Sequence, residues 1–124
     1  MRKALVVDDS KAMRSLLKGL LKQVGFEVAE AFEGRAGLER LRALGGVEVV
    51  LVDWHMPGMD GLSLIKALRA DAALASTKVL LCSSESEVAS VASALAAGAD
   101  ECIVKPFTKD ALVQKLKTMG IVPS

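Results

Sequence analysis

Four short apolar runs in this chain each lead directly into polar residues that can carry chemistry. The runs and the residues after them are 4–7 before Asp8 and Asp9, 49–52 before Asp53, 79–82 before Ser83 and Ser84, and 103–104 before Lys105. Runs of leucine and β-branched residues of this length are typical of strands buried on both faces, as in a parallel sheet. Parallel strands end at the same edge of a sheet, where open α/β folds bind ligands. The sequence therefore predicts that three carboxylates, a hydroxyl and an ammonium group meet at one edge.

Segments with helical periodicity separate the runs, so that strand and helix alternate five times. We expect strands at 4–7, 26–32, 47–52, 79–82 and 101–104, and helices at 10–24, 33–44, 62–69, 85–97 and 108–119. The first helix carries an apolar stripe that includes Leu16, and the fourth is expected to turn Leu95 inward. Right-handed crossovers place such helices on both faces of a parallel sheet. A length of 124 residues fits one domain over 1–124, with no output domain attached.

Composition excludes several classes of function. A formal net charge of +1 gives no attraction to nucleic acid, and no basic run is interleaved with aromatic residues. No apolar stretch reaches the roughly 18 residues of a membrane span, and the amino terminus lacks the features of a secretory signal. Cys82 and Cys102 have no metal-ligand spacing and are expected to be free thiols. We therefore expect a cytoplasmic protein that binds neither nucleic acid nor membrane.

The three acids at the predicted edge indicate a cation site. Carboxylates about 4 Å apart repel by roughly 4 kcal/mol at an effective dielectric constant of about 20, so a cation or a proton must compensate. Mg²⁺ suits hard oxygen ligands and is bound by one or two carboxylates together with phosphate oxygens. As the alternative, Asp8 or Asp9 caps the first helix, which explains one acid but not both together with Asp53 and Lys105.

Asp53 is the candidate nucleophile, because a carboxylate can attack phosphorus and form an acyl phosphate. Lys105 offers a compact positive charge for a phosphate oxygen, and Ser83 offers a small hydroxyl donor. Taken singly, these two residues would more often be a solvated lysine and a strand-end hydroxyl. Their position at one sheet edge favours the functional interpretation. Pro106 restricts Lys105 to extended geometry, and the sequence leaves their peptide bond open between cis and trans.

At this point the chain resembles the receiver domain of two-component response regulators, and among these the stand-alone chemotaxis regulators. The segments that carry the likeness are VVDDS at 6–10, VDWHMPGMDG at 52–61, SSE at 83–85 and KPFT at 105–108. The likeness covers essentially the whole chain. It implies a flavodoxin-like, doubly wound, five-stranded parallel sheet with strand order 2-1-3-4-5 and five helices.

The resemblance also implies a role for each matching residue. Asp53 would be the phosphoacceptor, supplied by a phosphohistidine on a sensor histidine kinase. Asp9 and Asp53 would bind Mg²⁺ through their side chains and His55 through its backbone carbonyl, with Asp8 close by. Ser83 and Lys105 would contact the phosphoryl group. Phosphorylation would then shift a two-state equilibrium that a downstream protein reads on the surface of the fourth helix, fifth strand and fifth helix.

Three positions depart from the pattern of the chemotaxis regulators. His55 stands in place of an asparagine, beside the route of a hydrolytic water, and is expected to change the lifetime of the phosphoaspartate. Ser83 replaces a threonine and keeps the hydroxyl. Cys102 replaces a tyrosine or phenylalanine whose rotamer follows the switch, so we expect weaker coupling or a different output surface. Ser84 and Glu85, which follow Ser83 in the motif, are grouped with His55 and Cys102 as residues that tune the switch.

Three interpretations of the function remain open at this stage. The first is a monomeric chemotaxis switch that binds a flagellar motor protein, and the second is a phosphorelay intermediate that passes phosphate to a histidine phosphotransfer protein. Both are phosphoacceptors rather than enzymes acting on a substrate, with slow self-catalysed dephosphorylation. The third is a phosphatase of the haloacid dehalogenase type, which needs a second acid two residues after its nucleophile. That position holds His55 after Asp53, which disfavours the enzyme.

Overall fold

A parallel sheet of five strands in the order β2-β1-β3-β4-β5 forms the centre of the fold in the computed structural model. The strands are β1 (Arg2–Val7), β2 (Phe26–Ala31), β3 (Val49–Asp53), β4 (Lys78–Ser84) and β5 (Glu101–Lys105). The helices are α1 (Lys11–Val24), α2 (Gly34–Leu44), α3 (Gly61–Ala70), the 3₁₀ turn η1 (Ala72–Leu74), α4 (Val91–Ala97) and α5 (Lys109–Thr118). Residues 1, 55, 57, 85–90 and 123–124 lie outside the residues that the structure describes. The predicted flavodoxin-like topology is confirmed.

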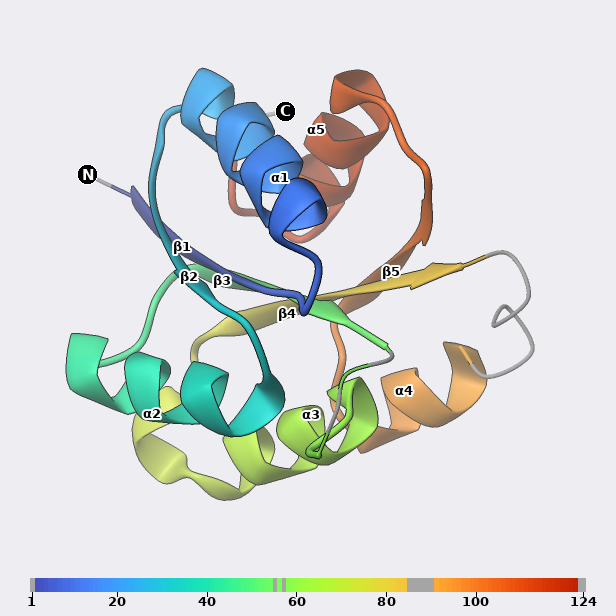
Figure 1. The fold of residues 1–124 in the computed structure, drawn as a ribbon. Coiled ribbons are helices and arrows are strands. Elements are labelled where there is room, and N and C mark those ends of the chain that lie inside the picture. The colour runs from blue at the N-terminus through green and yellow to red at the C-terminus, as the bar shows by residue number, and fades with distance from the viewer. Residues whose placement is uncertain (1, 55, 57, 85–90, 123–124) are drawn as a thin grey trace.

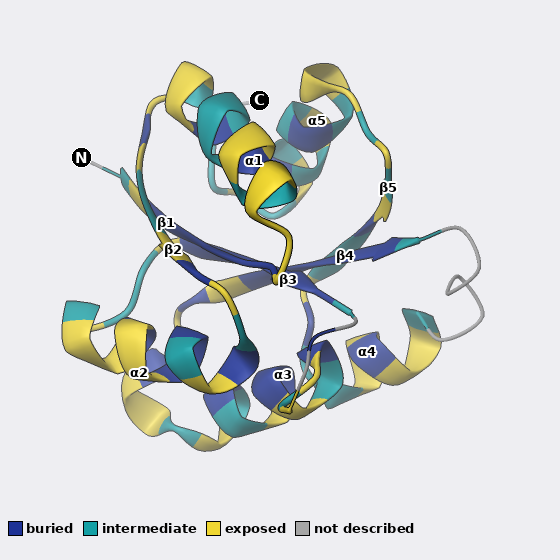
Figure 2. Cartoon of the chain, viewed as in Figure 1, coloured by how far each residue is buried: buried dark blue, intermediate teal, exposed yellow. Residues whose placement is uncertain are grey.

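Helices cover both faces of the sheet, with α1 and α5 on one side and α2, α3 and α4 on the other (Figure 1). Successive strand residues point to opposite faces, so neighbours such as Val6 and Val7 enter different cores. Both of these valines are fully buried, as is most of the central sheet (Figure 2). Burial on both faces explains why the strands appear in the sequence as continuous apolar runs.

Side-chain caps fix where the helices near the carboxyl edge begin. Ser10 Oγ accepts a hydrogen bond from the Met13 backbone N–H at 3.2 Å, and Asp60 Oδ1 accepts one from the Ser63 N–H at 2.8 Å. Caps of this kind contribute about 1 kcal/mol each to helix stability. Because Ser10 caps α1, neither of the acids before it is needed for that role. The alternative interpretation of Asp8 or Asp9 as the helix cap is therefore wrong.

Strand and helix boundaries differ from the prediction near the site. β4 continues through Ser84, because Ser83 and Ser84 pair with Val104 and Lys105 of β5. β3 begins at Val49, two residues later than expected. The predicted start of the fourth helix lies outside the described residues, and the described part of that helix is α4.

Two leucines that the helical periodicity predicts to be buried are exposed in the structure. Leu16 is 54% exposed, at the margin of the α1 stripe whose centre is the buried pair Leu17 and Leu21. Leu95 is 44% exposed because α4 presents the fully buried Ala94 to the core instead. Consecutive helix residues are turned by about 100° from each other, so burying one residue exposes the next. In the part of the chain that the structure describes, no helix has the length and apolarity to cross a membrane.

Candidate functional site

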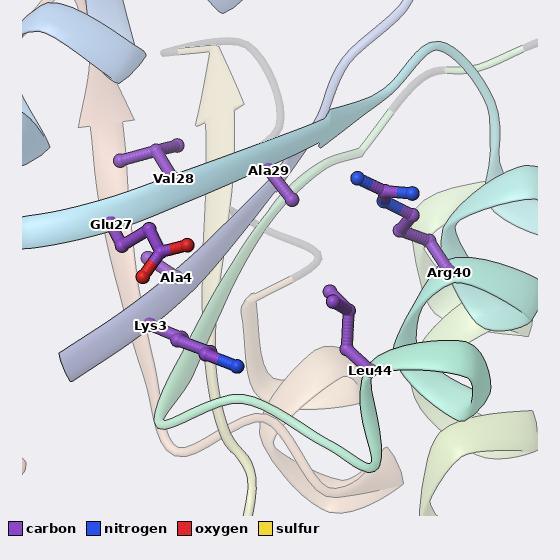
Figure 3. Close-up of a pocket in the computed structure, with 7 residues that line it drawn as sticks. All are labelled: Lys3, Ala4, Glu27, Val28, Ala29, Arg40 and Leu44. Atoms are coloured by element: carbon purple, nitrogen blue, oxygen red, sulfur yellow. The ribbon is translucent and has the colours of Figure 1, made fainter. Parts of the chain in front are cut away.

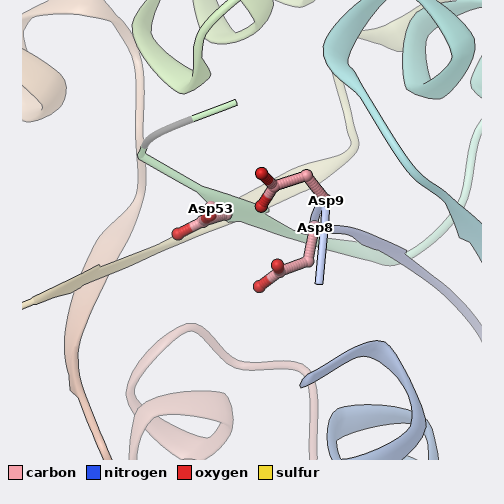
Figure 4. Close-up of side chains that lie close together, drawn as sticks. All are labelled: Asp8, Asp9 and Asp53. Carbon is pink, nitrogen blue, oxygen red and sulfur yellow. The ribbon is translucent and has the colours of Figure 1, made fainter. Parts of the chain in front are cut away.

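Three aspartates meet at the carboxyl edge of the sheet, as predicted. Asp8 and Asp9 follow β1 and Asp53 ends β3, and one carboxylate oxygen of each lies within 4.8 Å of the other two (Figure 4). Asp8 is 1% exposed and Asp53 is 8% exposed, whereas Asp9 lies on the surface. The cluster is thus buried at its base and open to solvent on the side of Asp9.

The ammonium group of Lys105 reaches this cluster from the end of β5. Its Nζ donates a hydrogen bond to Asp53 Oδ1 at 2.8 Å and lies 3.6 Å from Asp8 Oδ2. The first distance is that of a charge-assisted hydrogen bond, and the second is an ion-pair contact too long to be one. The structure therefore brings together the three acids and the lysine as the sequence predicted. The peptide bond from Lys105 to Pro106 is cis.

Two buried polar atoms at the site have no hydrogen-bond partner among the described residues. These atoms are Asp8 Oδ2 and the Ser83 hydroxyl oxygen, whose residues are each 1% exposed. A buried polar group without a partner costs about 1–3 kcal/mol, so such atoms call for a ligand, an ion or water. Both lie at the same sheet edge, since Ser83 follows the residue that pairs with Asp53.

The electrostatics of the site also favour a bound cation. Burial raises the pKa of Asp53 and the nearby charges of Asp8 and Asp9 raise it further, against the hydrogen bond from Lys105, which lowers it. Burial lowers the pKa of Lys105, but the hydrogen bond and charge of Asp53 and the charge of Asp8 outweigh it and leave the pKa raised. Burial is therefore the main cause of the raised pKa of Asp53, to which the repulsion among the three carboxylates adds, and the charge of the acids is what raises the pKa of Lys105. The ionised Asp53 carboxylate therefore costs folding free energy at neutral pH, and this cost is lost as pH falls through its folded pKa.

The residues present fit Mg²⁺. The cluster offers carboxylate oxygens alone, which are the hard ligands that Mg²⁺ takes, and one of them, Asp8 Oδ2, is buried without a hydrogen bond among the described residues. The exposed side of the cluster at Asp9 leaves room for the waters that Mg²⁺ retains. His55, which is predicted to contribute its backbone carbonyl, lies outside the described residues, and so does Glu85.

Gly61 holds the chain close to the phosphoacceptor position. Its N–H donates to the carbonyl oxygen of Trp54 at 3.0 Å, and a Cβ atom added to it would lie 2.5 Å from the carbonyl oxygen of Asp53. Real Cβ atoms essentially never come this close to another heavy atom. Glycine is therefore required here by the close approach of two backbone segments. The sequence motif includes Gly61 but gives no reason for it.

A charged cluster beside the first two acids was missed by the sequence analysis. Arg14 Nη1 donates to the backbone carbonyl of Asp8 at 2.8 Å, and Arg14 Nε donates to Glu30 Oε1 at 3.0 Å. Lys18 Nζ donates to the other oxygen of Glu30 at 2.8 Å. Hydrogen bonds from Lys18 and Arg14 hold the pKa of Glu30 below its usual value. Arg14 and Glu30 are 16 residues apart in the sequence, so no local pattern indicates their contact.

Of the residues predicted to tune the switch, the structure describes Ser84 and Cys102, which lie in β4 and β5. Cys102 is half-buried in β5, pairs with Leu81 of β4, and packs against the core under α2, α3 and α4. Ser84 ends β4 opposite Lys105 and is half-buried. Cys82 is fully buried, which raises the pKa of its thiol to about 12. Both cysteines are free thiols, as expected.

The structure also contains a surface cavity of about 110 Å³ that is remote from the acids (Figure 3). It lies between β1, β2 and α2 and is lined by Lys3, Ala4, Glu27, Val28, Ala29, Arg40 and Leu44. Lys3 and Ala4 belong to the first half of β1, whereas Asp8 and Asp9 follow its last residue. This cavity therefore takes no part in the site.

Comparison with known proteins defines the class. A sequence model of the response regulator receiver domain matches residues 4–117. The chain is 41% identical over 118 residues to the chemotaxis protein CheY1 of Helicobacter pylori, covering 94% of this chain and 95% of that protein. It is 39% identical over 116 residues to the chemotaxis protein CheY of Pseudomonas aeruginosa, covering 93% of each. The chain belongs to the response regulator receiver domain family, and within it is CheY-like.

Solved structures agree with this assignment. The chemotaxis protein CheY4 of Vibrio cholerae superposes with a TM-score of 0.87 at 31% identity, covering 95% of this chain and 98% of that one. The response regulator protein TrrA of Thermotoga maritima, in complex with Mg²⁺-BeF, superposes with a TM-score of 0.83 at 32% identity, covering 96% and 99%. The receiver family is one of phosphoacceptor switches that bind Mg²⁺ at an acidic site, and the aspartate cluster lies where such a site is expected.

Proposed function

We propose that this chain is a stand-alone response regulator that accepts a phosphoryl group on Asp53 and then changes its binding to a downstream protein. The observation that carries the proposal is the environment of Asp53. Its nearly buried carboxylate lies 2.8 Å from the Lys105 ammonium and within 4.8 Å of two further carboxylates. This is an arrangement for holding a phosphoryl group between a metal and a lysine, and the family relationship supports it.

The reaction follows from the chemistry of these groups. A carboxylate oxygen of Asp53 attacks the phosphorus of a phosphohistidine on a sensor kinase, the new P–O bond forms, and the P–N bond to the imidazole breaks. Lys105 and the hydroxyl of Ser83, which has no hydrogen-bond partner among the described residues, bind oxygens of the transferred group. Asp8, Asp9, Asp53 and the backbone of His55 would hold Mg²⁺, which when bound supplies positive charge against the phosphoryl oxygens. The Mg²⁺-BeF complex of TrrA supports this assignment.

The partners are proposed from the family relationship. A sensor histidine kinase would donate the phosphoryl group, and a flagellar motor protein would read the state of α4, β5 and α5. The names of the two similar chemotaxis proteins favour this role over that of a phosphorelay intermediate. We propose that the protein acts as a single receiver domain over 1–124 and as a monomer. The free thiols of Cys82 and Cys102 fit a reducing cytoplasm.

Incubation with Mg²⁺ and a small acyl phosphate tests the proposed switch. We expect the intact mass to increase by one phosphoryl group, with no increase for Asp53→Asn and none when a chelator removes the metal. The adduct should be labile, as an acyl phosphate is. Multiple turnover of organic phosphates without a stable adduct would instead identify a phosphatase and contradict the switch.

His55 is proposed to set the lifetime of the phosphoryl group. It follows Asp53 by two residues, and histidine is the residue type that most readily exchanges a proton near neutral pH, so we expect it to act on an attacking water in a pH-dependent way. We expect His55→Asn to change the dephosphorylation rate and to flatten its pH dependence between about pH 6 and 8. The decay of phosphorylated protein, followed by intact mass after donor removal, measures both. Identical decay at every pH would rule out this role.

Cys102 is proposed to weaken the coupling between the phosphoryl site and the output surface. Its small side chain occupies a position where many receivers have a tyrosine or phenylalanine, and it is half-buried against the α2, α3 and α4 core. In such receivers the aromatic ring changes rotamer when the protein switches. The cysteine side chain is too small to fill and vacate the same space. A phosphoryl-analogue complex should accordingly show little shift in the segment after Ser83, and a large rearrangement there would contradict the proposal.

A further inference from the structure

Asp8 is held through three of its four polar atoms. Its N–H donates to the carbonyl of Ala31 at 3.2 Å, and its carbonyl accepts from Arg14 Nη1 at 2.8 Å. Its Oδ1 accepts from the Ser10 N–H at 2.9 Å. The fourth atom, Oδ2, is buried without a hydrogen bond among the described residues and lies 3.6 Å from Lys105. The three contacts therefore fix the position of Oδ2 relative to Asp53 and Lys105.

Of the three contacts that hold Asp8, the one from Arg14 is made by a side chain. It is 15% exposed, and its planar guanidinium bonds the Asp8 carbonyl with one nitrogen and Glu30 with another. Glu30 lies near the end of β2 and accepts from Lys18 as well. Such a fork can hold two acceptors at fixed positions, which a lysine ammonium on a flexible stem does less well. Glu30 thus orients Arg14, and Arg14 fixes the turn that carries Asp8 and Asp9.

We infer that Arg14, oriented by Glu30, is a positioning residue for cation binding by the turn of Asp8 and Asp9. The inference rests on the proposed function, since it takes the acid cluster to be the Mg²⁺ site. Among the described residues, the hydrogen bonds of Arg14 go to the Asp8 carbonyl and to Glu30, so we take it to act through the backbone of Asp8. Groups that orient metal ligands from the next layer typically change metal affinity by about 10–100-fold when they are removed.

The sign of the effect separates positioning from plain electrostatics. A positive charge near a cation site repels the metal, so deleting any lysine or arginine there should by charge alone strengthen Mg²⁺ binding. A positioning role predicts the reverse for Arg14. Lys18 provides the matched control, because Lys18→Met removes the same charge from the same partner, Glu30, while leaving the Arg14 contact to Asp8 in place.

Mg²⁺ titration of the intact protein, followed by the fluorescence of its single tryptophan, Trp54, tests the inference. We expect Arg14→Met to weaken Mg²⁺ binding by about tenfold, Arg14→Lys to recover part of the loss, and Lys18→Met to bind at least as tightly as wild type. In phosphorylation by an acyl phosphate, Arg14→Met should need more Mg²⁺ for the half-maximal rate, and the rate at saturating Mg²⁺ should stay near that of wild type.

The other possible outcomes separate failure of the inference about Arg14 from failure of the proposed function. If Arg14→Met and Lys18→Met bind Mg²⁺ with equal affinity, Arg14 has only a structural role, whatever its effect on the free energy of unfolding. Should Arg14→Met not fold, Arg14→Lys keeps the positive charge and tests the guanidinium fork alone; it is expected to weaken Mg²⁺ binding by a smaller factor, and binding equal to that of wild type would overturn the inference. Wild-type protein that binds no Mg²⁺ would overturn the proposed function itself, and the inference with it.

Discussion

Lys105→Met is expected to slow phosphorylation of Asp53 by about 100-fold while it strengthens Mg²⁺ binding. The rate falls because the ammonium group 2.8 Å from Asp53 is placed to bind the oxygens of the incoming phosphoryl group, where negative charge gathers during transfer. The affinity for Mg²⁺ rises because the variant removes a cation that contacts both Asp53 and Asp8. The measurements are the rate of mass increase with an acyl phosphate and a Mg²⁺ titration monitored by Trp54 fluorescence.

Lys109→Met is the control for this prediction. Lys109 is the exposed first residue of α5, so the variant makes the same change in charge away from the acids. We expect its phosphorylation rate and its Mg²⁺ affinity to match those of wild type. A rate for Lys105→Met close to that of Lys109→Met would show that the lysine pairs with Asp53 without a part in transfer.

Gly61→Ala is expected to lower the free energy of unfolding by about 2–3 kcal/mol. The new methyl group would lie 2.5 Å from the Asp53 carbonyl oxygen and 3.1 Å from Trp54 Cα, so backbone must move to admit it. Because the displaced segment carries the nucleophile, phosphorylation should slow as well, by about tenfold or more. Denaturant unfolding and the rate of mass increase measure the two effects.

Gly19→Ala makes the matched comparison at an open position. Gly19 lies inside α1, and a Cβ atom there would meet nothing within 4 Å. Alanine in a helix interior is more stable than glycine by about 1 kcal/mol, so this variant should be stabilised and should be phosphorylated at the wild-type rate. Equal stability of Gly61→Ala and wild type would mean that the approach to Asp53 is not tight.

The sheet and the core of the site could be predicted from the sequence because both depend on local patterns. A buried parallel strand shows as an apolar run, and its carboxyl end shows as the first polar residue after it. For Asp8, Asp53 and Lys105 this is enough to place each residue at one edge, and β-sheet topology then brings the edge together. The strand order itself came from resemblance to a family, and the structure confirms it.

The remaining features depend on three-dimensional contacts that no local sequence pattern indicates. The burial of Leu16 and Leu95 was wrongly predicted because periodicity gives an apolar stripe but not which part of it meets the sheet. Pairing of β4 with β5 extends the strand past Ser83, which no single run indicates. The contact from Arg14 to Asp8 joins a helix to the turn before it, and the steric need for glycine at Gly61 arises from a carbonyl eight residues earlier.

Locating the phosphoryl group on the chain tests the central claim most directly. Protein treated with Mg²⁺ and an acyl phosphate can be reduced with borohydride, which converts a phosphorylated aspartate to homoserine, and then digested and sequenced by mass spectrometry. We predict that homoserine replaces Asp53 alone, and only when Mg²⁺ was present. Homoserine at Asp8 or Asp9, or an unmodified chain after full exposure to the donor, would contradict the assignment of this edge as a receiver's phosphoryl site.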